Sequence, residues 1–188
     1  MKKLVIILGS ILGVILILGV SLTGVYNSLV TRSQAVDGQW AQVQTQYQRR
    51  FDLIPNLVNS VKGIMAQEQT VFLAIADART RYAGATTPQD QTAAANDMES
   101  TLARLLVIME NYPQLRSIEA VTTLMDELAG TENRIAVERG RFNTEVRDYN
   151  IAIKRFPVVM VAGMFGFDQR DYFESFPGAN QPPKVDFR

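Results

Sequence analysis

The sequence predicts an all-α protein, with one N-terminal transmembrane helix, then an antiparallel helix bundle, then a mostly irregular C-terminal tail. Three observations lead to this fold class. An uncharged, apolar segment opens the chain, apolar residues then recur at steps of three and four, and no stretch alternates convincingly as a strand would. Helices that each carry one apolar stripe must bury these stripes against one another, and short connections make neighbouring helices antiparallel.

The predicted membrane anchor is the apolar segment of residues 4–25, which contains no charged residue. As a helix it would extend about 33 Å, enough to cross a hydrocarbon core of roughly 30 Å. A cleaved signal peptide is the alternative, but the small residues at the end of the segment lack a convincing Ala-x-Ala cleavage site. Lys2 and Lys3 precede the segment, so the positive-inside bias predicts a cytoplasmic N-terminus and a domain whose bulk is extracytoplasmic.

The whole chain is expected to have three parts: the anchor in residues 1–26, a helical bundle in residues 27–157, and an apolar segment with an extended tail in residues 158–188. The first bundle helix, or pair of helices, carries a long apolar stripe. Its members are Trp40, Val43, Tyr47, Phe51, Ile54, Val58, Val61, Met65, Phe72 and Ile75. Pro55 interrupts this stripe, and a proline either kinks a helix or marks the first turn of a new one. The apolar phase runs through Pro55 almost unbroken, which favours a kink.

Further helices follow after Gly84. Thr87 and Pro88 resemble an N-cap followed by proline at the first helical position, so a helix is expected from Pro88 to about Asn111. Pro113 begins the next helical pattern, in which residues 130–131 could form a notch. Their apolar stripes consist of Met98, Leu102, Leu105, Met109 and Tyr112, then Leu115, Ile118, Val121, Leu124, Met125 and Leu128, then Ile135, Phe142, Val146, Tyr149 and Ile153. Phe156 and Pro157 should end the helix, because the residue before proline avoids helical geometry.

Composition argues against most enzyme chemistry. The 188 residues include neither cysteine nor histidine, which removes thiol nucleophiles, cysteine-ligated metals, the commonest general base and the usual transition-metal ligand. No glycine-rich phosphate loop or nucleophile elbow is present either. We expect no enzyme, no cofactor and no metal site. Lys2 and Lys3 lie before the anchor, which leaves 17 basic and 19 acidic residues beyond it, so nucleic acid is not an expected partner.

The densest polar group of the chain lies in residues 49–57, where charges, a proline and an amide interrupt a regular helical pattern. Local departures from a rule can mark function. The candidate partner-binding or structural residues are Arg49, Arg50, Asp52, Pro55 and Asn56. In the structural interpretation, which we favour, Asp52 pairs with Arg49 or Arg50 and caps the kink or the next helix. In the functional one, the motif forms a ligand or partner surface.

The apolar segment of residues 156–167 is a second candidate surface, because it can cover the core or dock on a partner or a bilayer. We expect it to cover the core.

Many of these residues resemble the LemA family. The resemblance rests on residues 26–30, 40–58 and 61–63, on Ala78-Arg79, on residues 110–115 and 131–136, and on Phe142-Asn143, Tyr149-Asn150, Phe156-Pro157 and Gly166-Phe167. It covers nearly the whole chain. Phe51 and Phe142 stand where tyrosine is common, and Gln114 where an acid is common, which are mild departures.

The resemblance implies a membrane-anchored four-helix up-and-down bundle, so it favours a turn near residues 52–55 over the kink that the apolar phase favours. We adopt the bundle and leave the kink and the turn at Pro55 open as alternatives. It implies no activity and no catalytic residues. We expect a non-enzymatic scaffold or adaptor at the bacterial cell envelope that binds an envelope protein. A relative of the family takes part in shaping bacterial organelle membranes, so membrane organisation by a homo-oligomer is the alternative. A sensor with a ligand among its helices is a third hypothesis.

Overall fold

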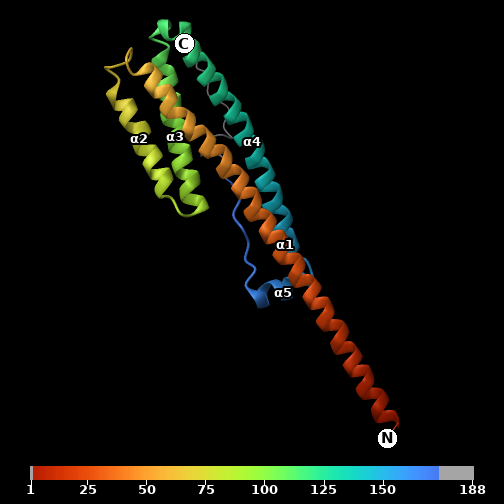
Figure 1. Cartoon of the computed structure of the whole chain (residues 1–188). Coiled ribbons are helices and arrows are strands. Elements are labelled where there is room, and N and C mark those ends of the chain that lie inside the picture. The colour runs from red at the N-terminus through yellow and green to blue at the C-terminus, as the bar shows by residue number, and fades with distance from the viewer. Residues whose placement is uncertain (1, 174–188) are drawn as a thin grey trace, which may run out of the picture. The chain divides into compact units, whose positions relative to one another are not determined.

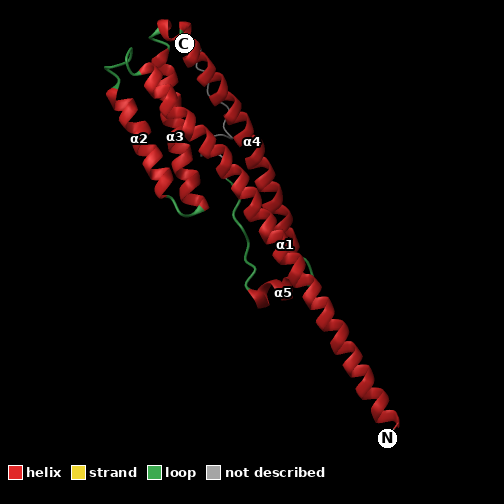
Figure 2. Cartoon of the chain, in the orientation of Figure 1, coloured by secondary structure: helices red, strands yellow, loops and turns green. Residues whose placement is uncertain are grey.

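The computed structural model describes residues 2–173, which form helices joined by turns and loops, with no strand in this part of the chain (Figures 1 and 2). The all-α prediction is therefore confirmed. The helices are α1 (Lys2–Val61), α2 (Gln69–Gly84), α3 (Pro88–Met109), the short 3-10 helix η1 (Pro113–Ser117), α4 (Glu119–Lys154) and α5 (Val158–Phe165). The end of the predicted tail, residues 174–188, lies outside the described residues.

The described chain divides into two compact units, and α1 and α4 contribute to both. The bundle unit comprises residues 43–138, with the last third of α1, all of α2, α3 and η1, and the first part of α4. The anchor unit comprises residues 2–42 and 139–172, with the beginning of α1, the end of α4 and α5.

Four helical segments form the bundle unit. Gln44 of α1 donates a hydrogen bond of 2.7 Å to Gln91 of α3, and Arg50 lies further along next to Glu99, so α1 and α3 run parallel. Arg50 also reaches α4, at Glu132.

Helix α2 lies beside α3 (Figure 1). Arg81, near the end of α2, forms an ion pair of 2.7 Å with Asp97 on α3. At the opposite end of this pair, Tyr112, just after α3, donates to Glu68, just before α2. The two helices are therefore antiparallel, as an up-and-down bundle requires.

The predicted apolar stripes form the core of the bundle unit. Buried members include Val43, Tyr47, Phe51, Ile54, Val61, Met65, Ile75, Met98, Leu102, Leu105, Met109, Leu115, Val121, Leu128 and Ile135. Two predicted positions are shifted by one residue, because Leu57 and Val71 are buried while Val58 and Phe72 are half-buried. An α-helix has 3.6 residues per turn, so a stripe built from steps of three and four residues slowly rotates around the helix. At these two positions the preceding residue faces the core instead of the predicted one.

Of the two alternatives at Pro55, the turn near residues 52–55 is wrong, because α1 continues through Pro55 to Val61. Proline removes one backbone hydrogen bond and distorts a helix, but it does not change which side chains share a face. Phe51, Ile54 and Leu57 are all buried, so the apolar face is unbroken on both sides of Pro55. Reversal comes later, in the turn of residues 62–68 that leads to α2.

The other helix ends follow local sequence signals. The Thr87 side chain accepts a hydrogen bond of 3.1 Å from the Asp90 backbone N–H, which confirms the predicted N-cap of α3. Pro113 begins η1 rather than a long α-helix, and α4 begins only at Glu119. Helix α4 passes residues 130–131 without interruption and ends at Lys154, before the Phe156–Pro157 pair, as expected.

In the anchor unit, α1 begins with apolar side chains that face outward. The exposed fraction is 67% at Ile6, 62% at Leu16 and 74% at Val20. Of the helices in the described chain, α1 alone is long and apolar enough to cross a membrane. Burial begins further along α1, where Leu29 and Val36 belong to a core that also includes Phe142, Val146, Tyr149 and Ile153 of α4.

Candidate functional site

The structure separates the predicted 49–57 motif into buried and exposed residues, all in the bundle unit. Arg50 is buried, with 5% of its surface exposed, and Pro55 is half-buried inside α1. Arg49, Asp52 and Asn56 are exposed. The motif therefore consists of an interior residue and a separate surface, rather than one cluster of five side chains.

Arg50 places a positive charge inside the bundle. Its guanidinium lies 3.9 Å from a Glu99 oxygen and 3.8 Å from a Glu132 oxygen, on α3 and α4 respectively. Both distances are ion-pair distances too long for a hydrogen bond, and the buried Nε and Nη1 find no hydrogen-bond acceptor among the described residues. The buried guanidinium therefore links α1 to α3 and α4, at a cost in hydration energy that comes with burial of a charge.

The expected pairing of Asp52 with Arg49 or Arg50 is replaced by other contacts among the described residues. Asp52 accepts a hydrogen bond of 2.9 Å from Gln48, one turn earlier on α1, while Arg50 turns toward Glu99 and Glu132. Positions 50 and 52 point to different sides of the helix, because successive residues are rotated by about 100°. Asp52 is thus a surface residue and caps no kink.

Arg49, Asp52 and Asn56 lie at spacings of three and four, which puts them on one exposed face of α1. Arg49 also lines an open hollow of about 330 Å³ together with α4 residues that include Asp126, Glu127 and Arg134. We call the three α1 residues and this hollow the charged face. It offers both signs of charge and an amide to the solvent.

An aromatic cluster lies beside the charged motif. Tyr82 of α2 makes an edge-on contact with Phe51, with ring centroids 4.3 Å apart, and a second, tilted contact with Tyr47 at 5.9 Å. Burial raises the pKa of the Tyr82 hydroxyl to about 12. These rings hold α2 against α1 and keep the phenol neutral throughout the physiological pH range.

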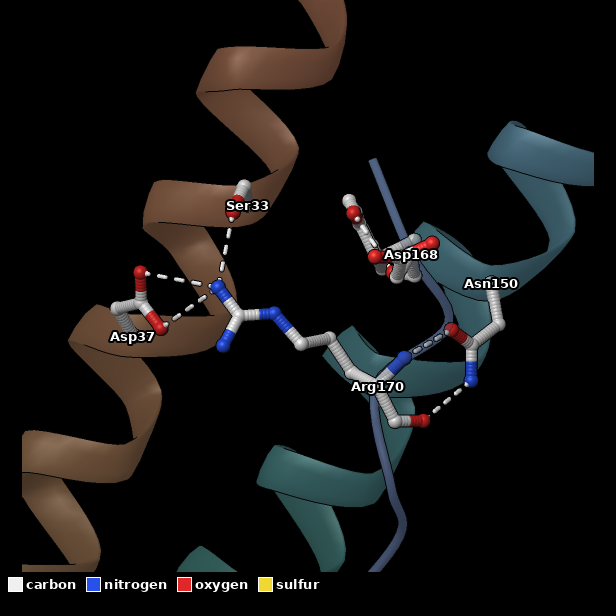
Figure 3. A network of polar contacts seen from close by, with 6 residues as sticks. Ser33, Asp37, Asn150, Asp168 and Arg170 are labelled. Atoms are coloured by element: carbon white, nitrogen blue, oxygen red, sulfur yellow. Dashed lines mark hydrogen bonds and ion pairs between the residues drawn. The ribbon is translucent and has the colours of Figure 1, made fainter. Parts of the chain in front are cut away.

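A second arrangement, in the anchor unit, was not predicted from the sequence (Figure 3). The side-chain amide of Asn150 donates to the Arg170 carbonyl at 2.8 Å and accepts from the Arg170 N–H at 2.9 Å. The neighbouring Tyr149 hydroxyl donates to the Asp168 carbonyl at 3.0 Å. The Asn150 amide therefore makes the same two hydrogen bonds with the Arg170 backbone that a neighbouring β-strand would make. We call the contacts of Asn150 and Tyr149 with the segment after α5 the clamp.

The Arg170 side chain extends the clamp to α1. Its guanidinium donates to the Ser33 hydroxyl at 3.2 Å and lies 3.3 Å from an Asp37 carboxylate oxygen (Figure 3). Ser33 and Asp37 are one turn apart on the same face of α1. The segment after α5 is therefore attached to both long helices of the anchor unit.

The sequence indicated the residues on the α4 side of the clamp but not their partners. Tyr149-Asn150 was among the pairs that carry the family resemblance, and a buried asparagine near a helix end needs a partner for its amide. Nothing local connects Asn150 with Arg170, or Arg170 with Asp37, which is 133 residues earlier in the chain.

Helix α5 only partly covers the core. Val161 and Ala162 are buried, but Met160, Met164 and Phe165 are exposed. The Tyr26 ring lies 4.9 Å from the Phe165 ring and 5.7 Å from the Phe167 ring, so this end of α5 is beside α1. The expectation that residues 156–167 cover the core is therefore right for the buried side of α5 and wrong for its exposed side.

Comparison with known proteins agrees with this architecture. The sequence model of the LemA family matches residues 39–187. The chain is 27% identical to magnetosome proteins MamQ 1 and MamQ 2 of Paramagnetospirillum magneticum and to magnetosome protein MamQ of Magnetospirillum gryphiswaldense. Each similarity covers 84% of this chain and 67% of the relative. Because the family match includes most of the chain, from the last part of α1 through α4 and α5, this protein belongs to the LemA family.

Proposed function

We propose that the protein is a non-enzymatic scaffold or adaptor of the bacterial cell envelope, held in the membrane by the first part of α1. The observation that carries the proposal is the charged face, an open polar surface on a bundle whose apolar stripes are buried. Charged residues that only keep a protein soluble do not need to line a hollow. A docking surface, in contrast, combines a shape that fits the partner with charges that complement those of the partner.

The anchor supports the same proposal. Apolar side chains exposed from Ile6 to Leu22 would be unfavourable in water, and a lipid bilayer is the solvent that suits them. Lys2 and Lys3 precede this segment, so the N-terminus stays in the cytoplasm and the bundle faces outward. A chain without cysteine or histidine is poorly equipped for catalysis, which favours a binding role.

Capture of a partner at the charged face tests the adaptor function. A photo-crosslinking amino acid replaces Asn56 in the full chain, cells are irradiated, and captured proteins are identified by mass spectrometry. Asp52→Arg reverses an exposed charge on the same helix face, one turn away. Asp77→Arg makes the same change on an exposed part of α2 and is the matched control.

An adaptor gives a distinct crosslinked protein that Asp52→Arg abolishes and Asp77→Arg retains. A captured set that neither substitution changes, or no adduct at all, contradicts docking at the charged face. Adducts that consist only of the protein itself favour the alternative function, membrane organisation through self-association. That alternative draws support from the similarity to magnetosome proteins and from the apolar side chains that α5 exposes.

A further inference from the structure

The outer side of α5 is an apolar surface without polar side chains. From Phe156 to Phe167 the chain contains only apolar residues, proline and glycine. The exposed fraction is 80% at Phe156, 65% at Met160, 72% at Met164 and 53% at Phe165. A helix that faces water on one side normally carries polar residues there, and a contiguous exposed apolar patch marks a contact with a partner or a bilayer.

The position of this surface indicates what covers it. Tyr26 is the first residue after the apolar segment that ends at Val25, so its ring lies where that segment would leave a membrane. The Phe165 and Phe167 rings pack against Tyr26 with centroids 4.9 Å and 5.7 Å away. Tyrosine and tryptophan gather at this level in membrane proteins, because an apolar ring with a polar edge suits the boundary between lipid and water, and Tyr26 fits this position.

The clamp fixes the C-terminal end of α5 at this level. Asn150 and Tyr149 hold the backbone at Arg170 and Asp168, and Arg170 binds Ser33 and Asp37 on α1. Asp37 follows Tyr26 by about three helical turns. The chain after α5 therefore runs along α1 from Tyr26 toward Asp37, away from the apolar segment. The C-terminal end of α5 lies beside Tyr26.

Charged residues flank the apolar surface on its N-terminal side. Lys154 and Arg155 are exposed and immediately precede Phe156. Short apolar segments with adjacent basic residues lie in the plane of a membrane interface, where the apolar side enters the acyl chains and the cations meet anionic headgroups.

We propose that α5 is an interfacial membrane helix, whose outer side inserts into the same bilayer that α1 crosses. This inference rests on the proposed membrane anchor and adds a second, shallow contact with lipid. The apolar surface of α1 and that of α5 meet at Tyr26 and form one continuous lipid-facing surface, which is the reason for choosing a bilayer over a second protein chain. Two contacts at one bilayer surface also restrict how the anchor unit tilts.

Spin labels on single cysteines test the proposal directly, because the chain has no cysteine of its own. Met160→Cys and Met164→Cys place labels on the outer side of α5. Leu16→Cys reports the middle of the proposed span, and Thr144→Cys reports an exposed site on α4 about 15 Å before Lys154. The labelled full chain is reconstituted in vesicles of phosphatidylethanolamine and phosphatidylglycerol. Collision with oxygen, which concentrates in lipid, is compared with collision with a water-soluble nickel chelate.

An interfacial α5 gives oxygen-to-nickel ratios at Met160 and Met164 several-fold above that at Thr144 and below that at Leu16. If the ratios at Met160 and Met164 equal that at Thr144 while Leu16 lies in lipid, the inference about α5 is overturned and the proposed membrane anchor still holds. Labels shielded from both reagents also overturn it, because they show that protein covers α5. A water-exposed label at Leu16 refutes the anchor and the inference together.

Discussion

At the scale of single residues, burial decides what the charges of the 49–57 motif do. Arg49 and Arg50 are neighbours of the same type, but Arg49 is exposed and Arg50 is almost completely buried. The Arg50 guanidinium faces Glu99, which is itself only 19% exposed, so loss of the cation would leave a largely buried carboxylate without its counter-charge. The two arginines therefore differ in their contribution to stability.

Replacement of Arg50 by alanine should lower the free energy of unfolding by roughly 2–4 kcal/mol, from the lost attraction to Glu99 and the lost packing of the side-chain stem. Arg49→Ala is the matched control and should change it by less than about 0.5 kcal/mol. Denaturant unfolding of the full chain in detergent, followed by circular dichroism, measures both values. Equal effects of the two substitutions would refute the interior role of Arg50.

The raised pKa of Tyr82, about 12, predicts a loss of stability at high pH. Between pH 10 and 12 the unfolded chain releases the Tyr82 proton while the folded chain keeps it, so unfolding becomes more favourable as pH rises. Tyr82→Phe, which keeps the ring contacts with Phe51 and Tyr47, should reduce this decline and leave stability near pH 7 little changed. Unfolding curves at pH 8, 10 and 11.5 measure the slope. An identical alkaline decline in both proteins would contradict the prediction.

At the scale of elements, the clamp fastens an irregular segment to two helices. Asn150 satisfies both backbone groups of Arg170 through one side-chain amide, a geometry that requires both a donor and an acceptor at the same position. The adjacent Tyr149 hydroxyl donates to the Asp168 carbonyl, and burial raises the pKa of this hydroxyl. The position of α5 depends on these contacts.

Asn150→Leu keeps the size of the side chain and removes both hydrogen bonds, so the segment after α5 should detach. Two lost bonds cost about 1–3 kcal/mol locally. Hydrogen exchange at the Arg170 amide should accelerate by about tenfold or more, since 1.4 kcal/mol corresponds to a factor of ten. Asn133→Leu, at an exposed position of α4, is the control. Unchanged exchange at Arg170 in the Asn150 variant would show that other contacts hold the segment.

At the scale of the whole molecule, α1 is at once the proposed membrane span and the first helix of the bundle. No break separates the two parts between Lys2 and Val61. Helical hydrogen bonds satisfy the backbone in lipid and in water alike, so one helix can serve both environments with only a change of side chains. The predicted boundary at residue 26 is thus a change in side-chain chemistry without a change in backbone structure.

The side of the membrane on which the bundle lies can be measured with one added cysteine. Asp77→Cys places a thiol on an exposed part of α2 in a chain that has none elsewhere. The two lysines before the span predict an extracytoplasmic bundle. A membrane-impermeant maleimide should therefore label this thiol in cells whose outer barrier is permeabilised but whose cytoplasmic membrane is intact. Lysed cells give the total amount of reactive thiol. Labelling only after lysis would place the bundle in the cytoplasm.

The sequence by itself determined the helical class, the core stripes, the cap at Thr87, the end of α4 before Pro157 and the family. These features depend on local patterns, because the 3.6-residue period and the geometry of proline act within a few positions. Only the tertiary structure decided that α1 continues through Pro55, that Arg50 lies inside while Arg49 lies outside, and that Arg170 reaches Asp37. The apolar phase favoured a helix through Pro55 without excluding a turn, and the burial of Arg50 depends on its packing against α3 and α4. The contact of Arg170 with Asp37 spans 133 residues, which leaves no periodic trace in one sequence.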